Sequence, residues 1–85
     1  MTYLAVSTNT GDPSRLFEAE GRRTAELMGS GAVQHVWLKA DWSGAVFVLS
    51  SDDEIEARAV VESLPIARAG LTTFVLTPLL VPPGA

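Results

Sequence analysis

Two side chains in this sequence, those of Glu20 and His35, have types and surroundings suited to proton transfer. His35 is the only histidine of the chain, and it lies between apolar residues in the segment 31–41, two positions before Trp37. An imidazole with an ordinary pKa of about 6.5 can accept or return a proton at neutral pH. If the protein is an enzyme, we expect this segment to take part in catalysis.

Glu20 interrupts an apolar pattern with helical spacing. It lies four positions after Leu16 and seven before Leu27, in the middle of the stripe that would face the rest of the domain. Burial there would raise the pKa of the carboxyl towards neutrality, as a general acid or base requires, and Arg23 or Thr24 would orient it. In the alternative, the helix is rotated slightly, and Glu20 pairs with Arg23 at the surface.

The same two interpretations apply to the residues around His35. Trp37 shares the side of the strand with His35 at a two-residue spacing, so the two would form one pocket wall. The alternative is a structural histidine beside an aromatic residue of the core or of a subunit interface. The candidate catalytic residues are therefore Glu20 and His35, and the candidate substrate-binding residues are Arg23, Trp37 and Phe17.

The elements that would position these residues alternate along the chain. Strand patterns cover residues 3–8, 32–40, 45–50 and 71–77, and helical spacing covers residues 14–29 and about 52–64. The residues Asp41-Trp42-Ser43-Gly44 have the composition of a hairpin turn. Ser51 with Glu54 resembles a capping box before the second helix, which Leu64-Pro65 would end. The order β-α-β-β-α-β predicts an α+β, ferredoxin-like fold with an antiparallel sheet of four strands.

The length of 85 residues leaves room for one domain, which we expect over residues 1–78, with a proline-rich tail over residues 79–85. Of the 85 residues, 47% are hydrophobic, and a single domain of this size cannot bury all the apolar surface that they bring. Both faces of the sheet are expected to be apolar: Val36 and Leu38 would oppose Val33 and Trp37, and residues 45–49 alternate apolar side chains on both sides. Because two helices cover only one face, the other should pack against a second copy as a homodimeric barrel.

Composition excludes several classes of function. A formal charge of -4 opposes binding to nucleic acid. The absence of cysteine and the single histidine argue against a zinc site, and no phosphate-binding loop or Gly-x-Ser-x-Gly motif is present. No apolar run reaches the roughly 18 residues that would span a bilayer, and the N-terminus lacks a signal-peptide pattern. We expect a cytoplasmic protein without cofactor, metal, nucleic acid or membrane partner.

The segment 31–76, with its His35-x-Trp37 strand, Leu64-Pro65-Ile66 and a following strand, resembles the muconolactone isomerases of the dimeric α+β barrel group. The resemblance implies ferredoxin-like dimers that can assemble further, and proton transfer in an unsaturated lactone without cofactor or metal. The isomerases have arginines where this chain has Gln34 and Leu38, and a lysine where it has Gly21. Their polar C-terminal segment corresponds here to the apolar residues 78–83. These differences imply a relative with a more apolar pocket.

Three functional hypotheses follow from the sequence. The first is a cofactor-independent isomerase or cyclase that uses Glu20 and His35 on a small apolar oxygenated molecule derived from a lactone, a polyketide or an aromatic compound, as in secondary metabolism. By analogy with the fold group, a cofactor-free monooxygenase is an alternative. The second is a noncatalytic protein that binds a small molecule in the same pocket. The third is an assembly module without an enclosed pocket.

Overall fold

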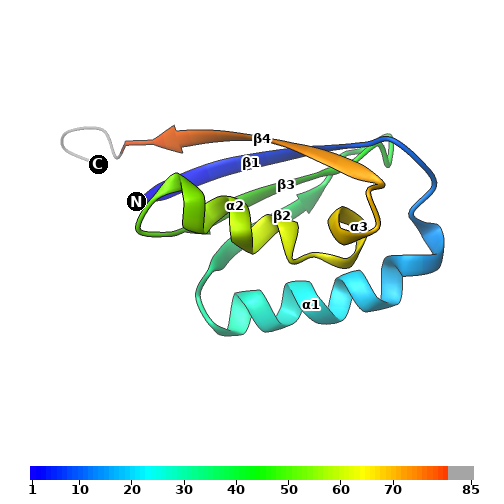
Figure 1. The fold of residues 1–85 in the computed structure, drawn as a ribbon, viewed down its shortest axis with the longest axis horizontal. Coiled ribbons are helices and arrows are strands. Elements are labelled where there is room, and N and C mark those ends of the chain that lie inside the picture. The colour runs from blue at the N-terminus through cyan, green and yellow to red at the C-terminus, as the bar shows by residue number, and fades with distance from the viewer. Residues whose placement is uncertain (81–85) are drawn as a thin grey trace.

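The computed structural model describes residues 1–80 (Figure 1). Its elements follow the predicted order, with one additional short helix before the last strand. They are β1 (Thr2–Asn9), the 3-10 turn η1 (Ser14–Leu16), α1 (Phe17–Gly29), β2 (Val33–Leu38), β3 (Ala45–Ser50), α2 (Glu54–Glu62), α3 (Pro65–Arg68) and β4 (Thr72–Leu79).

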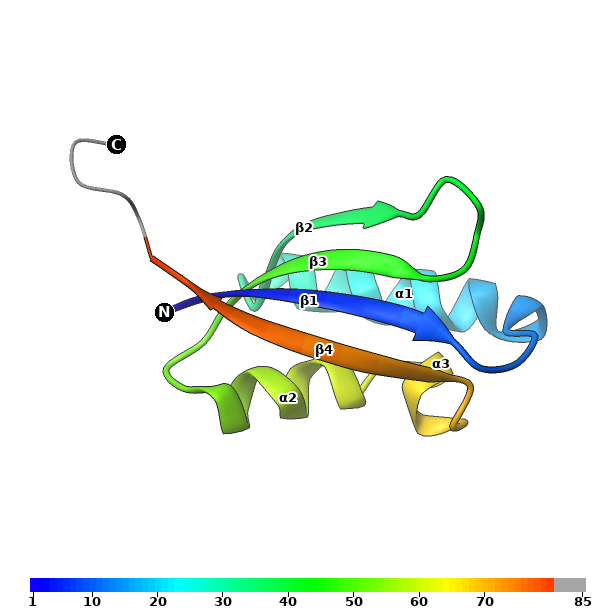
Figure 2. The same ribbon diagram turned by 90° about the horizontal axis from the view of Figure 1, so that it is seen from above.

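The strands form one sheet of four in the order β2-β3-β1-β4, and each neighbouring pair is antiparallel. The helices all lie on one face of this sheet, with α1 across the half formed by β2 and β3, and with α2 and α3 along β4 (Figure 2). This arrangement confirms the α+β, ferredoxin-like fold predicted from the order of elements.

The core lies between the sheet and the helices. Alternate residues of β1 and β3 point into it, because successive side chains of a strand lie on opposite faces. Leu49, Leu64, Val33 and Val61 are the largest side chains that are completely buried there. Within residues 1–80, no helix covers the opposite face of the sheet, which we call the outer face (Figure 1). This face carries Leu4, Val6, Trp37, Val46, Val48 and Val75.

A β-bulge changes the side-chain alternation that the sequence suggested for β2. The pairing with β3 shifts between Val33 and His35, so that Val33 and Val36, three positions apart, both face the helices. The prediction that Val33 lies on the same side as Trp37 is therefore wrong. The irregularity inserts one residue into the strand, and a strict two-residue alternation does not extend across it.

The second helical segment begins and ends differently from the prediction. Asp53, not Ser51, caps α2: its side chain accepts a hydrogen bond from the backbone N–H of Glu56 at 2.8 Å. Ser51 is buried instead. Pro65 interrupts the helical segment but then occupies the first turn of α3, where a proline loses no hydrogen bond.

The last strand is longer than predicted. β4 continues through Pro78 to Leu79, and these residues pair with Tyr3 and Thr2 of β1. A proline is tolerated here because β4 is an edge strand. The ordered sheet therefore extends one residue beyond the expected domain boundary at residue 78, and the expected proline-rich tail lies mainly at residues 81–85, outside the described residues.

Candidate active site

A cavity of about 490 Å³ lies between α1 and the sheet. Its walls come from α1, from all four strands, from the turn between β2 and β3 and from α3. Apolar and aromatic side chains dominate the lining, and a few polar groups converge on the same space. Cavities of this size and character typically accommodate small organic ligands.

Glu20 lines this cavity from α1 and is partly buried. The backbone N–H of Ile66, in the first turn of α3, donates a hydrogen bond to Glu20 Oε1 at 3.0 Å. Burial raises the pKa of the Glu20 carboxyl above its ordinary value, and the hydrogen bond from Ile66 offsets part of that rise. The site therefore holds a carboxyl group that binds a proton more readily than one in water.

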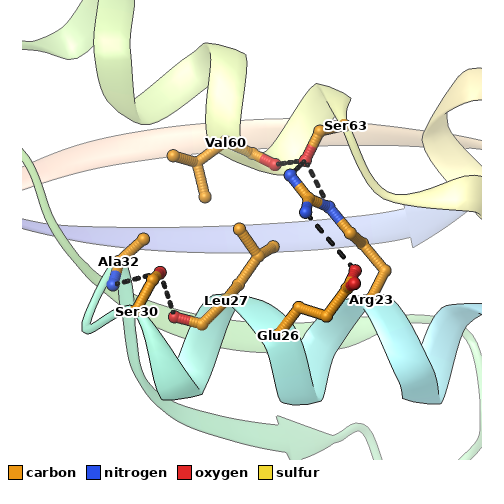
Figure 3. A network of polar contacts seen from close by, with 7 residues as sticks. All are labelled: Arg23, Glu26, Leu27, Ser30, Ala32, Val60 and Ser63. Carbon is orange, nitrogen blue, oxygen red and sulfur yellow. Dashed lines mark hydrogen bonds and ion pairs between the residues drawn. The ribbon is translucent and has the colours of Figure 1, made fainter.

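Arg23 does not orient Glu20. Its guanidinium donates two hydrogen bonds to Ser63 Oγ, from Nε at 3.2 Å and from the terminal nitrogen at 3.0 Å, and a third to Glu26 Oε1 at 3.4 Å (Figure 3). Ser63 Oγ in turn donates to the carbonyl of Val60 at 2.6 Å. Arg23 therefore ties α1 to the end of α2 beside a separate, open cleft that it shares with Arg68.

His35 and Trp37 lie on the outer face of the sheet. His35 pairs with Val48, and Trp37 pairs with Val46, both of which point away from the helices. The two rings stack with centroids 5.4 Å apart and an interplanar angle of 19°. Within one chain, the structure does not bring His35 and Glu20 together, since the sheet separates them.

Phe17 is the candidate substrate-binding residue that lines the cavity together with Glu20. Its ring contacts Trp42 of the turn between β2 and β3, with centroids 6.3 Å apart. On the sheet side of the cavity, Phe47 and Phe74 form a second aromatic pair at 5.9 Å. The cavity thus has aromatic rings on two sides.

Sequence reasoning favours Trp37 over Trp42 as the ring that stacks on a planar ligand, and it does not identify Phe74. In the structure Trp42 and Phe74 line the cavity, and Trp37 does not. A tryptophan in a hairpin turn was the available signal for Trp42, because turns favour small or polar residues. Phe74 gave no such signal, since an aromatic residue is expected in any apolar strand.

The charge of the lining is also distinctive. Among the described residues, no lysine, arginine or histidine lines the cavity, and Glu20 is the one acidic residue there.

No cluster of three or more His, Cys, Asp or Glu residues within residues 1–80 could hold a metal ion. In the same part of the chain, none of the helices has the length and apolar character needed to cross a membrane.

Two comparisons with known proteins gave no match: none of the family models matches the chain, and neither does any curated protein. Solved structures do match. A crystal structure of muconolactone isomerase is 17% identical and has a TM-score of 0.80, with 100% of this chain and 94% of that chain covered. The 5-chloro-2-hydroxyhydroquinone dehydrochlorinase TftG from Burkholderia phenoliruptrix AC1100, in complex with 2,5-dihydroxybenzoquinone, is 18% identical, with a TM-score of 0.72 and 94% of each chain covered.

These likenesses confirm the predicted resemblance at the level of the fold. The fold is that of muconolactone isomerase, and both neighbours are enzymes that share it. At this identity the likeness defines the architecture, and the chemistry has to be argued from the cavity itself.

Proposed function

We propose that this protein is a cofactor-independent enzyme of the isomerase or cyclase type, which transfers a proton within a small, largely apolar oxygenated molecule. The observation that carries the proposal is the carboxyl group of Glu20 at an apolar cavity, with its pKa raised by burial. A carboxyl tuned towards neutrality can both take a proton from a substrate and return it. The fold shared with an isomerase and a dehydrochlorinase supports an enzymatic role.

The contacts of Glu20 suggest how it would act. The N–H of Ile66 holds Oε1, and Oε2 has no hydrogen-bond partner among the described residues. Oε2 would accept a proton from a carbon next to a carbonyl group of the substrate and return a proton at a conjugated position, so that the double bond moves with no net gain or loss of protons. The proton held on Oε2 between the two steps would exchange with solvent. Closure of the cavity around an apolar ligand would remove water from the carboxylate and strengthen it as a base.

A noncatalytic binding protein is the second candidate, and one observation favours it. Glu20 accepts a hydrogen bond at the start of α3, where backbone N–H groups otherwise lack partners. That contact would by itself explain a carboxylate on this face of α1. The two candidates differ in what happens to a bound ligand, not in whether one binds.

We also propose a homodimer in which the outer faces of two sheets pack together. The apolar residues of this face and the stacked pair His35 and Trp37 would then lie in the subunit interface. His35 keeps its proposed role in the site only if the partner chain brings it to a cavity. Otherwise its role is in assembly.

The test of the proposed chemistry is solvent deuterium exchange, which detects proton transfer without knowledge of the final product. The protein is incubated in D₂O with a panel of unsaturated lactones and cyclic enones, and incorporation of deuterium is followed by NMR. Glu20→Gln keeps the shape and the hydrogen-bond acceptor but cannot transfer the proton, and we expect it to slow exchange by about 10²–10⁴-fold.

Glu18→Gln is the matched control, because Glu18 lies on the same helix, is exposed and pairs with Arg22. It should exchange at the wild-type rate. If compounds of the panel bind but Glu20→Gln and wild type exchange deuterium equally, the protein is a binding protein and Glu20 a structural residue.

A further inference from the structure

We infer that Trp42 is a specificity-determining residue of the cavity, which covers one face of a flat, uncharged ring system in the ligand. The inference rests on the proposed use of the cavity as a ligand site and adds to it the residue that selects the ligand and the class of ligand selected. Three independent observations support it: the backbone at Trp42, the arrangement of aromatic rings and the charge of the lining.

The backbone holds Trp42 in an unusual conformation. Its φ is 64°, and it is the one residue other than glycine with a positive φ among residues 1–80. A bulky side chain is disfavoured in this left-handed region, where glycine or asparagine usually occurs. A tryptophan that persists there indicates that something other than turn stability maintains it, and such positions are frequent at ligand sites.

Several hydrogen bonds fix the turn in this conformation. Trp42 N–H donates to the carbonyl of Lys39 at 2.9 Å, and Asp41 Oδ1 accepts from the N–H of Ser43 at 3.0 Å. Asn9, at the end of β1, attaches the turn to the sheet: its N–H donates to the carbonyl of Ser43 at 2.7 Å, and its side-chain amide donates to that of Trp42 at 3.4 Å. The backbone from which the indole projects is thus fixed beside the cavity.

The aromatic rings of the cavity form two pairs from different elements. Trp42 and Phe17 make one pair, at an interplanar angle of 40°, and both side chains are largely exposed, at 66% and 48% of their surface. Phe47 and Phe74 make the other pair on the sheet. Aromatic rings interact best with other flat unsaturated rings, by offset stacking or edge to face. A planar ligand would bury the exposed indole and complete these contacts.

The charge of the lining selects against anions. Glu20 is the one ionisable residue among the described lining residues, and no cation there would pair with a carboxylate on the ligand. Leu38 lines the cavity from β2 with an uncharged side chain. An anionic ligand would lose its hydration without a compensating partner and would lie near a second carboxyl group.

The test compares three probes that share one fused two-ring framework: 2-naphthol, which is planar and neutral, 2-naphthoate, which is planar and anionic, and decahydro-2-naphthol, which is neutral but saturated. Dissociation constants are measured by isothermal titration calorimetry. We expect 2-naphthol to bind about tenfold or more tightly than either of the other two probes. Equal affinity for 2-naphthol and decahydro-2-naphthol would overturn the inferred preference for a flat ring, and equal affinity for 2-naphthoate would overturn the preference for an uncharged ligand.

The variants assign the preference to Trp42. Glycine adopts a positive φ without strain, so the melting temperature of Trp42→Gly should be higher than that of wild type or within a few degrees of it. The variant should nevertheless bind 2-naphthol about tenfold more weakly. Trp42→Phe should retain most of the affinity. Trp37→Ala is the matched control, since Trp37 is similarly exposed but lies on the outer face, and it should bind 2-naphthol as wild type does.

The outcomes separate this inference from the proposed function. If 2-naphthol binds but Trp42→Gly leaves its affinity unchanged, the cavity is a ligand site and the inferred role of Trp42 is wrong. If Trp42→Gly instead changes the oligomeric state, Trp42 is a subunit contact and the inference is again wrong. If none of the probes binds while deuterium exchange depends on Glu20, the inferred ligand class is wrong and the proposed proton transfer stands.

Discussion

A carboxyl group whose pKa is raised by folding makes stability depend on pH in a defined direction. The pKa of Glu20 in the folded chain lies above its ordinary value of 4.5, so the folded state binds this proton more tightly than the unfolded state does. The contribution of Glu20 to stability is therefore fully present below the unfolded pKa and is lost as the pH rises through the folded pKa.

The variant Glu20→Gln isolates this effect, because glutamine does not titrate and can still accept the hydrogen bond from Ile66. We predict that the stability of wild type relative to Glu20→Gln decreases as the pH is raised from about 4 to about 7. Urea denaturation of both proteins across this range measures the difference. A difference that stays constant with pH would mean that Glu20 is solvated in the same way in both states.

The close approach of two backbone segments predicts a second effect at the residue scale. A Cβ atom on Gly44 would lie 2.0 Å from the backbone carbonyl oxygen of Ser7, and backbone atoms cannot yield as a flexible side chain does. Gly44→Ala should therefore destabilise the fold by about 1–3 kcal/mol or more. Gly29→Ala is the control, since nothing lies within 4 Å of a Cβ atom there, and thermal unfolding should show it as stable as wild type or more so.

At the scale of one element, α1 contains an interior glycine that lowers the stability of the helix and faces the cavity. Gly21 lies in the interior of this helix and lines the cavity, and a Cβ atom there would have no neighbour within 4 Å. We predict that Gly21→Ala stabilises the protein by about 0.5–1 kcal/mol, because alanine favours the helix more than glycine. Gly21→Leu should remain folded but fill part of the cavity and weaken binding of 2-naphthol.

Thermal unfolding and calorimetry of both variants distinguish the two effects. A Gly21→Leu variant that binds 2-naphthol as tightly as wild type would show that the ligand occupies another part of the molecule. A Gly21→Ala variant that loses stability would show that the glycine is needed by the backbone and not by the cavity.

The elements also show what a sequence can predict and what it cannot. Helical spacing placed Glu20 on the stripe of α1 that meets the sheet, and strand alternation placed His35 and Trp37 on one side of β2. Which side faces the helices depends on the bulge between Val33 and His35, and the sequence does not mark this bulge because β2 has apolar residues on both sides. Within one chain the sheet therefore separates Glu20 from His35, and a pocket that holds both stays a prediction about the assembled protein.

Contacts between distant segments were equally inaccessible to sequence reasoning. Arg23 and Ser63 are 40 positions apart in the sequence, and the hydrogen bond between them directs Arg23 away from Glu20. Ile66 and Glu20 are 46 positions apart. A local pattern predicts an element and its exposed or buried side, whereas the partner of a polar side chain is determined by tertiary packing.

At the scale of the whole molecule, the helices cover one face of the sheet, and no other described element covers the second face. The outer face carries Val46, Val48, Leu4 and Val6 in its centre, and Val75 is 69% exposed at its edge. A continuous apolar surface of this kind favours association over exposure to water. Because the side chains of this face do not enter the core of the domain, assembly and folding can be separated by mutation.

Val48→Asp makes this separation. Val48 faces outward from β3, so an aspartate there should leave the far-ultraviolet circular dichroism of the domain unchanged. In a sheet-to-sheet dimer the same carboxylate would be taken out of water opposite His35, and one such pairing does not repay the desolvation of a buried charge. The net cost of several kcal/mol is enough to shift a micromolar dimer to monomer. We therefore predict a folded monomer, measured by size-exclusion chromatography with light scattering.

Ala59→Asp on the exposed side of α2 is the control and should assemble as wild type does. If Val48→Asp assembles as wild type does, the outer face is not the interface.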